Sequence, residues 1–184
     1  MPITGHGWEM LIVRRAEQYR PSEDRTRTVG DYRIYHDGVE QSGPAMSGMV
    51  AETHGPGKNT PVNNGLRIEE GRYPLATQDG NDYVTYGYSA SDDAGAGPKP
   101  GLELLNTGER TEILLHPGHD FLASVGCINP CTSLPDESED ITYASSRRRV
   151  ITIIADIRAF VGAGFPATNG KRIPNAFIVI DGEP

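Results

Sequence analysis

Both cysteines of the chain and two of its five histidines lie within one short segment, residues 116–131, with the sequence HPGHDFLASVGCINPC. This grouping allows three interpretations: a thiol nucleophile with its base, a small metal site, or a turn without chemistry. A thiol must lose its proton before it attacks a carbonyl carbon, so a nucleophilic cysteine needs a base or a positive charge nearby. Cys127 and His116 are the residues that such chemistry would use.

The residues around Cys127 suit a nucleophile. His116 follows the apolar segment 111–115 (TEILL), which is typical of a buried strand, and a strand end is a rigid place from which to orient an imidazole. Gly126 lets the backbone approach a substrate closely, and N–H groups near Cys127 could stabilise an oxyanion.

The same segment also fits a metal site. His116, His119, Cys127 and Cys131 form the pattern H-x2-H-x7-C-x3-C, whose four side chains could close a tetrahedral zinc site. The C-x3-C spacing is less usual than C-x2-C, and Pro130 stiffens the segment between the cysteines. A disulfide between the two cysteines is a further alternative, and it would block the nucleophile.

The composition is that of a loop-rich globular chain. Its 184 residues include 22 Gly and 14 Pro, which predicts a single domain over residues 1–184 and a mainly β fold with one C-terminal α-helix. The net charge of −8 argues against a nucleic-acid partner, because binding phosphates needs a basic face.

The N-terminal sequence bears on where the protein acts. It lacks the basic region followed by an apolar region that a signal peptide needs, and no apolar stretch reaches the length of a membrane span. We therefore expect synthesis in the cytoplasm and no membrane span. If the target lies outside that compartment, another component must deliver the protein.

Apolar alternation predicts the strands that would position the cysteine segment. They are expected at residues 8–19, 31–38, 47–53, 66–70, 72–77, 82–89, 111–115 and 175–182, with a break at Gly71. Polar, Gly-rich and Pro-rich stretches predict turns at 20–30 and 54–65, and Asp37-Gly38 is a hairpin signal.

One segment, residues 145–162, has the apolar spacing of a helix. The expected buried stripe is Val150, Ile153, Ile154, Ile157, Phe160 and Val161. Ser145 or Ser146 would serve as N-cap and Gly162 as the C-terminal stop. Three arginines, residues 147–149, lie in the first turn, where we expect them to pair with the acidic loop 136–140 or to bind an acidic substrate or partner.

The order of these residues resembles that of a known enzyme family. A histidine on a strand followed by S-x-G-C-hydrophobic-N is similar to the signature of L,D-transpeptidases of the YkuD type, with His116, Ser124, Gly126, Cys127 and Asn129 at the matching positions. Papain-like and NlpC-type peptidases have the cysteine before the histidine. Roughly residues 47–130 resemble most closely a compact phage and bacterial family with the motif R-x-x-I-L-I-H-P-G-N…G-C-I.

The resemblance implies an L,D-transpeptidase-like β-sandwich or barrel that acts on peptidoglycan stem peptides without a metal or organic cofactor. Cys127 would form a thioester, His116 would be base and then acid, and Ser124 or a carbonyl near Pro117 would orient the imidazole. Arg110 could bind a substrate carboxylate or serve only as a paired structural arginine.

Asn129 and His119 are further candidates for contacts with substrate. Asn129 could instead shape the turn before Pro130, and His119 is the next candidate for the base.

The resemblance leaves transfer and hydrolysis open, so the activity would be that of an L,D-transpeptidase or of an L,D-carboxypeptidase or endopeptidase. A phage lysis protein or a secreted antibacterial effector, with an immunity or delivery protein as partner, fits the expected absence of a signal peptide. The site of action would then be the periplasm or cell wall. The alternatives are a non-catalytic cell-wall-binding or virion structural module of the same fold, and a small zinc-stabilised interaction domain.

Overall fold

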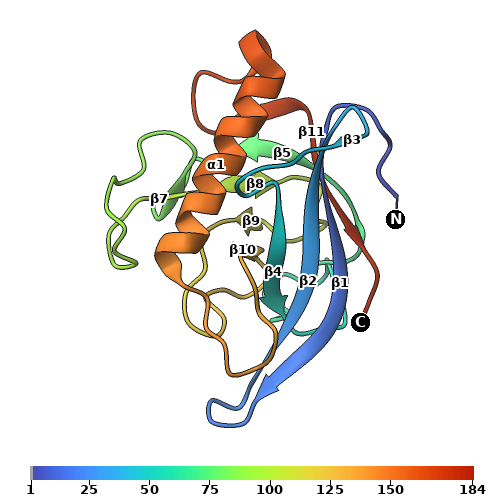
Figure 1. Ribbon diagram of the computed structural model, residues 1–184, viewed down its shortest axis with the longest axis vertical. Helices are drawn as coiled ribbons and strands as arrows, with labels where there is room; N and C mark the ends of the chain where they lie inside the picture. Colours follow the sequence, from blue (N-terminus) through green and yellow to red (C-terminus); the bar gives the residue numbers. More distant parts are fainter. Residues whose placement is uncertain (1) are drawn as a thin grey trace.

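The computed structural model describes residues 2–184, which are mainly β with one α-helix close to the C-terminal end (Figure 1). The strands are β1 (Trp8–Arg20), β2 (Arg25–His36), β3 (Val39–Glu40), β4 (Ser47–Thr53), β5 (Gly71–Thr77), β6 (Tyr83–Val84), β7 (Lys99–Pro100), β8 (Leu102–Leu104), β9 (Leu114–Leu115), β10 (Asn129–Cys131) and β11 (Arg172–Asp181). The α-helix is α1 (Tyr143–Val161), followed by the 3-10 helix η1 (Gly162–Gly164).

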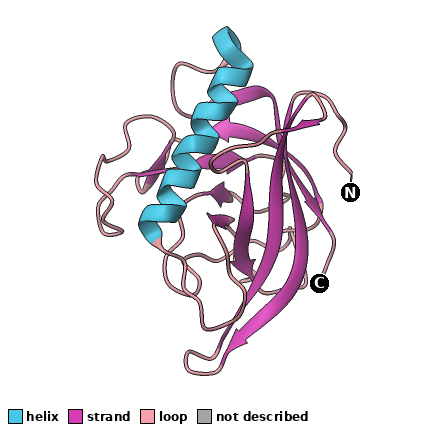
Figure 2. Ribbon diagram, in the orientation of Figure 1, coloured by secondary structure: helices cyan, strands magenta, loops and turns pink. Residues whose placement is uncertain are grey.

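One curved sheet carries most of these strands, in the order β10-β4-β2-β1-β11-β5-β8-β9, with β3 paired to β2. The pair β1 and β11 is parallel, and the other pairs along this path are antiparallel. The sheet nearly closes on itself, because Leu115 in β9 forms a parallel bridge with Ile128, directly before β10. The N–H of His116 donates to the Ile128 carbonyl (3.1 Å), and the Ile128 N–H donates to the Leu114 carbonyl (2.8 Å). The result is a barrel-like sheet (Figure 2).

The first hairpin is longer than the sequence predicts. The polar composition predicts a turn over residues 20–30, but the turn is confined to residues 21–24 and β2 starts at Arg25. This part of β2 contains polar residues because loop backbone on one side of the strand supplies hydrogen-bond partners for them. The fully buried guanidinium of Arg27 donates to the carbonyls of Phe121, Asp136 and Glu139. Strand alternation alone does not reveal this partner loop.

Other strand predictions were too long. Regular structure within 82–89 is limited to Tyr83–Val84 and within 111–115 to Leu114–Leu115, since the flanking residues form loops. No strand occupies 66–70, and Gly71 begins β5 instead of interrupting it. The turn at Asp37-Gly38 and the irregular segment 54–65 are confirmed.

The predicted helix is confirmed, and its apolar stripe packs into the barrel core. Val150, Ile153, Ile154 and Ile157 are buried among side chains from the sheet, whereas Phe160 and Val161, expected to be buried too, are only partly buried against this core. Gly162 ends the helix with a φ of 62°. The N-cap prediction was wrong, because the helix begins one turn earlier, after Thr142. Within residues 2–184, no helix is long and apolar enough to cross a membrane.

The expected pairing of the helix arginines with the acidic loop 136–140 was also wrong. Arg147 contacts Asp92 (3.0 Å) and the Ser89 carbonyl, and Arg149 donates to the Tyr32 hydroxyl (2.7 Å). Charge complementarity predicts only that partners exist, and the nearest ones come from other loops.

Candidate active site

The closure of the sheet places the cysteine and the histidine on one face of two neighbouring segments. Leu115 and Ile128 are bridge partners, and both side chains are fully buried in the main core. Because side chains alternate between the two faces of a sheet, the residues next to this pair share the opposite face. His116, Cys127 and Asn129 therefore project on one side of two neighbouring parallel segments.

Cys127 is a buried thiol, 9% exposed. Its sulfur accepts a hydrogen bond from the Leu114 N–H (3.4 Å) and donates one to the Glu112 carbonyl (3.6 Å). Burial raises the pKa of the thiol to about 11 and outweighs the opposing effects of the Leu114 N–H and the Arg110 charge. At neutral pH the thiol therefore carries its proton.

His116 is 2% exposed and has a defined orientation. Its Nδ1 lies 2.9 Å from the carbonyl oxygen of Pro117. A carbonyl can only accept, so Nδ1 carries the proton and Nε2 is left as the acceptor. The ring packs against Tyr83, with 4.3 Å between centroids. Burial lowers the pKa of His116 to about 4, so the imidazole is neutral at neutral pH.

Asn129 links the histidine to the serine of the motif. Its Nδ2 donates to the His116 carbonyl (3.1 Å), and its Oδ1 accepts a hydrogen bond from the Ser124 hydroxyl (3.1 Å). Asn129 is fully buried, so it braces the loop 117–128 from inside. The same Nδ2 also lies 3.4 Å from Nδ1 and 3.5 Å from Nε2 of the His116 ring, so Asn129 contacts both the backbone and the imidazole of His116, and Ser124 reaches the histidine through it.

Gly126 and Arg110 form a close contact next to the nucleophile. Gly126 has a φ of 92°, and a Cβ built on it would lie 1.8 Å from Nη2 of Arg110. Nη1 of Arg110 donates to the carbonyls of Lys58 (3.1 Å) and Leu66 (2.8 Å). Arg110 is 6% exposed, so this arrangement favours the structural interpretation of Arg110 over binding of a substrate carboxylate.

The other residues of the metal hypothesis lie apart from this site. The exposed His119 contacts Asp120 (2.8 Å), and Cys131 is buried in a separate small cluster with its sulfur donating to the Met49 carbonyl (3.4 Å). Neither lines the cavity beside Cys127, and both cysteines are free thiols. Residues 2–184 contain no group of three or more His, Cys, Asp or Glu residues that could hold a metal ion.

A cavity of about 390 Å³ opens beside Cys127 and His116. Ser124 and Ala123 form part of its wall. The remaining lining residues, which the sequence did not single out, are Gln78, Gly80, Asn81, Asp82, Tyr83, Glu112 and Leu114. The alternation in segment 82–89 predicts a regular strand, and no signal in it indicates that Tyr83 contacts His116. A larger hollow of about 660 Å³ lies between α1 and residues 85–88, but its lining includes neither cysteine nor histidine.

Comparison of the chain with protein-family models, with curated proteins and with solved structures finds no match in any of the three.

Proposed function

We propose that the protein is a cysteine enzyme that catalyses acyl transfer on peptidoglycan stem peptides, with Cys127 as nucleophile and His116 as base. One observation carries the proposal. Cys127 and His116 share one face of neighbouring parallel segments and line the same cavity, and the Pro117 carbonyl holds the proton on Nδ1, so that Nε2, with Nδ2 of Asn129 at 3.5 Å, is the acceptor nitrogen of the ring. The order of His116 before Cys127 and the S-x-G-C motif support an enzyme of L,D-transpeptidase type, and the mainly β architecture is compatible with the fold that this type of enzyme implies.

The resting electrostatics define how such a reaction would begin. Both groups are neutral near pH 7, so the thiol proton must pass to Nε2 of His116 as the sulfur adds to the substrate carbonyl carbon. The C–N bond then breaks as the imidazolium returns this proton to the leaving amine, which yields a thioester on Cys127. Water or a second amine attacks the thioester, and the thiol is regenerated together with an acid or a new amide.

The cavity also suits the substrate class. Asp82 and Glu112 both line it, and their carboxylates would attract a substrate that carries an ammonium group. A diamino-acid residue of a peptidoglycan stem peptide has such a group. Action on this substrate implies that the protein reaches the periplasm or cell wall by delivery or lysis.

The test is incubation of the protein with purified muropeptides, with products identified by mass spectrometry. We expect cleaved or exchanged stem peptides with the parent, no turnover with Cys127→Ala, and a loss of about 10²-fold or more with His116→Ala, the scale of general base catalysis. Cys131→Ala is the matched control and should stay active, because Cys131 lies outside the cavity. Product formation by Cys127→Ala at the parental rate would disprove the nucleophile assignment.

A second candidate is a non-catalytic cell-wall-binding or virion module of the same fold. The burial of the Cys127 thiol favours it, because a buried neutral cysteine commonly serves as a small apolar side chain of the core. Retention of the parent on insoluble peptidoglycan, with no product formed and equal retention of Cys127→Ala, would support this function over the enzyme.

A further inference from the structure

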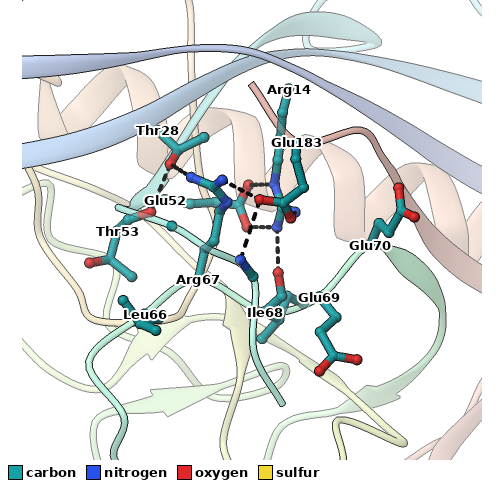
Figure 3. Close-up of polar contacts among 12 residues, drawn as sticks. Arg14, Thr28, Glu52, Thr53, Leu66, Arg67, Ile68, Glu69, Glu70 and Glu183 are labelled. Atoms are coloured by element: carbon teal, nitrogen blue, oxygen red, sulfur yellow. Dashed lines mark hydrogen bonds and ion pairs between the residues drawn. The ribbon is translucent and has the colours of Figure 1, made fainter. Parts of the chain in front are cut away.

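Two buried arginines converge on one carboxylate in a part of the molecule that the proposed reaction does not use (Figure 3). Arg14 comes from β1 and Arg67 from the loop between β4 and β5. The carboxylate belongs to Glu183, which follows β11. The side chains of the arginines are 0% and 3% exposed, whereas that of Glu183 is 43% exposed.

Arg14 is fixed mainly by contacts other than Glu183. Its Nε and Nη2 donate to the two carboxylate oxygens of the buried Glu52 at 2.9 and 2.8 Å, and Nη2 also donates to the Ile68 carbonyl (2.7 Å). Only Nη1 points to Glu183, with 3.1 Å to Oε1. Without Glu183, the Arg14 guanidinium would keep its place but lose one partner.

Arg67 has the same arrangement. Its Nη1 donates to Glu17 Oε1 (2.7 Å) and to the Thr28 hydroxyl, while Nη2 donates to Oε2 of Glu183. The Nε of Arg67 is buried and has no hydrogen-bond partner among residues 2–184. Arg67 therefore offers more donors than its neighbours accept.

The backbone opens space for the carboxylate. The Gly57 N–H donates to Oε2 of Glu183 (3.3 Å), and a Cβ on Gly57 would lie 2.6 Å from Oε1. A Cβ on Gly55 would meet Nη2 of Arg67 at 2.1 Å. The two glycines of the segment HGPG thus leave room for a guanidinium and a carboxylate to meet.

The charges show that Glu183 is not needed to neutralise the arginines. Glu52 already balances Arg14, and Glu17 balances Arg67. What Glu183 satisfies is a set of three convergent N–H donors, two of them from buried arginines, while its own side chain stays 43% exposed. Fixed donors around a solvent-accessible carboxylate are the geometry of a binding site.

We propose that Arg14, Arg67 and the Gly57 N–H form a carboxylate-binding site, which the Glu183 side chain occupies and which accepts an external aliphatic carboxylate when residues 182–184 withdraw. Such a ligand is a small organic acid or an acidic group of a peptide. Glu183 is tethered, so its effective concentration at the site is in the millimolar range or above and it excludes weak external ligands. The site belongs to the same chain as the proposed active site but does not depend on that function.

Rescue of a vacated site by acetate tests the proposal. Glu183→Ala removes the resident carboxylate and should lower the melting temperature. Sodium acetate should restore it saturably, with half-saturation in the millimolar range, relative to sodium chloride at the same ionic strength. The parent should not respond, because its site is filled. If Glu183→Ala does not fold in chloride, acetate in the refolding buffer should recover folded protein.

Two variants provide controls. Glu70→Ala removes a carboxylate that accepts from the Gly182 N–H but does not bind either arginine, so acetate should not change its melting temperature. Glu183→Ala combined with Gly57→Ala puts a methyl group into the carboxylate position, with its Cβ also 2.7 Å from the Ile68 carbonyl oxygen, so the variant should melt lower than Glu183→Ala and show no rescue by acetate. Acetate that stabilises none of the variants, recovers no folded protein, or stabilises Glu70→Ala as strongly as Glu183→Ala overturns the proposal.

Discussion

Replacing Gly126 by alanine tests whether the contact with Arg110 shapes the loop that carries Cys127. Gly126 has a φ of 92°, where an alanine costs about 1–2 kcal/mol more than glycine. Its new Cβ would also lie 1.8 Å from Nη2 of Arg110, so the guanidinium must move. That motion strains the hydrogen bonds to the Lys58 and Leu66 carbonyls, and a hydrogen bond to a charged group contributes about 1.5–3 kcal/mol.

The expected loss in the free energy of unfolding for Gly126→Ala is therefore about 3 kcal/mol or more. Gly65→Ala is the matched control, because Gly65 has a φ of 77° but a Cβ added to it would have no described atom within 4 Å. Both substitutions change the unfolded chain equally, so this contribution cancels in the comparison. Gly65→Ala should lose only the backbone cost, about 1–2 kcal/mol.

Equilibrium urea unfolding, followed by far-UV circular dichroism, gives both values. We expect Gly126→Ala to be less stable than Gly65→Ala by about 2 kcal/mol. A difference below about 0.5 kcal/mol would refute the reasoning, because Arg110 would then have moved away without losing its partners.

Three further predictions concern the histidines and cysteines. The pKa of His116 is lowered to about 4, so between pH 6.5 and 4 the unfolded chain binds more protons than the folded protein. The free energy of unfolding of the parent should therefore fall by about 3 kcal/mol as pH falls through this window. Urea unfolding at pH 7 and pH 4.5 should show a smaller decrease for His116→Gln than for the parent. The rate of alkylation of Cys127, measured in a Cys131→Ala background, should rise about tenfold per pH unit from pH 7 to 10, because the pKa of the Cys127 thiol is about 11. A rate that is already constant near pH 7 would indicate a preformed thiolate. Cys131→Ala should lower stability by about 1 kcal/mol and His119→Ala by less than about 0.5 kcal/mol, and a chelator-dependent melting temperature would contradict this expectation.

The sequence predicts the features that depend on local periodicity. The stripe from Val150 to Ile157 identifies α1 because every third or fourth residue is apolar, and Gly162 marks its end. The hairpin at Asp37-Gly38 follows from the positive φ that both residues adopt there. These features need no knowledge of distant segments.

Features that depend on distant partners could not be predicted in this way. Arg27 is fully buried in β2 because carbonyls about a hundred residues further along the chain accept its hydrogen bonds. Tyr83 contacts His116 because the segment 78–83 lines the cavity, and Glu52 is buried because Arg14 pairs with it. In each case the sequence contains the polar residue but not the identity of its partner.

The pairing of Cys127 with His116 could be predicted only in part from the sequence. Their order and spacing in the sequence indicate the chemistry, but the ten residues between them do not by themselves bring two side chains to one face. The two backbone hydrogen bonds of Ile128, to Leu114 and His116, set this register, and the same two bonds close the sheet between β9 and β10. A slip of one residue would turn Cys127 into the core and Ile128 into the cavity. The apolar side chains of Leu115 and Ile128 oppose that slip, so the burial that stabilises the closed sheet also fixes the geometry of the candidate site.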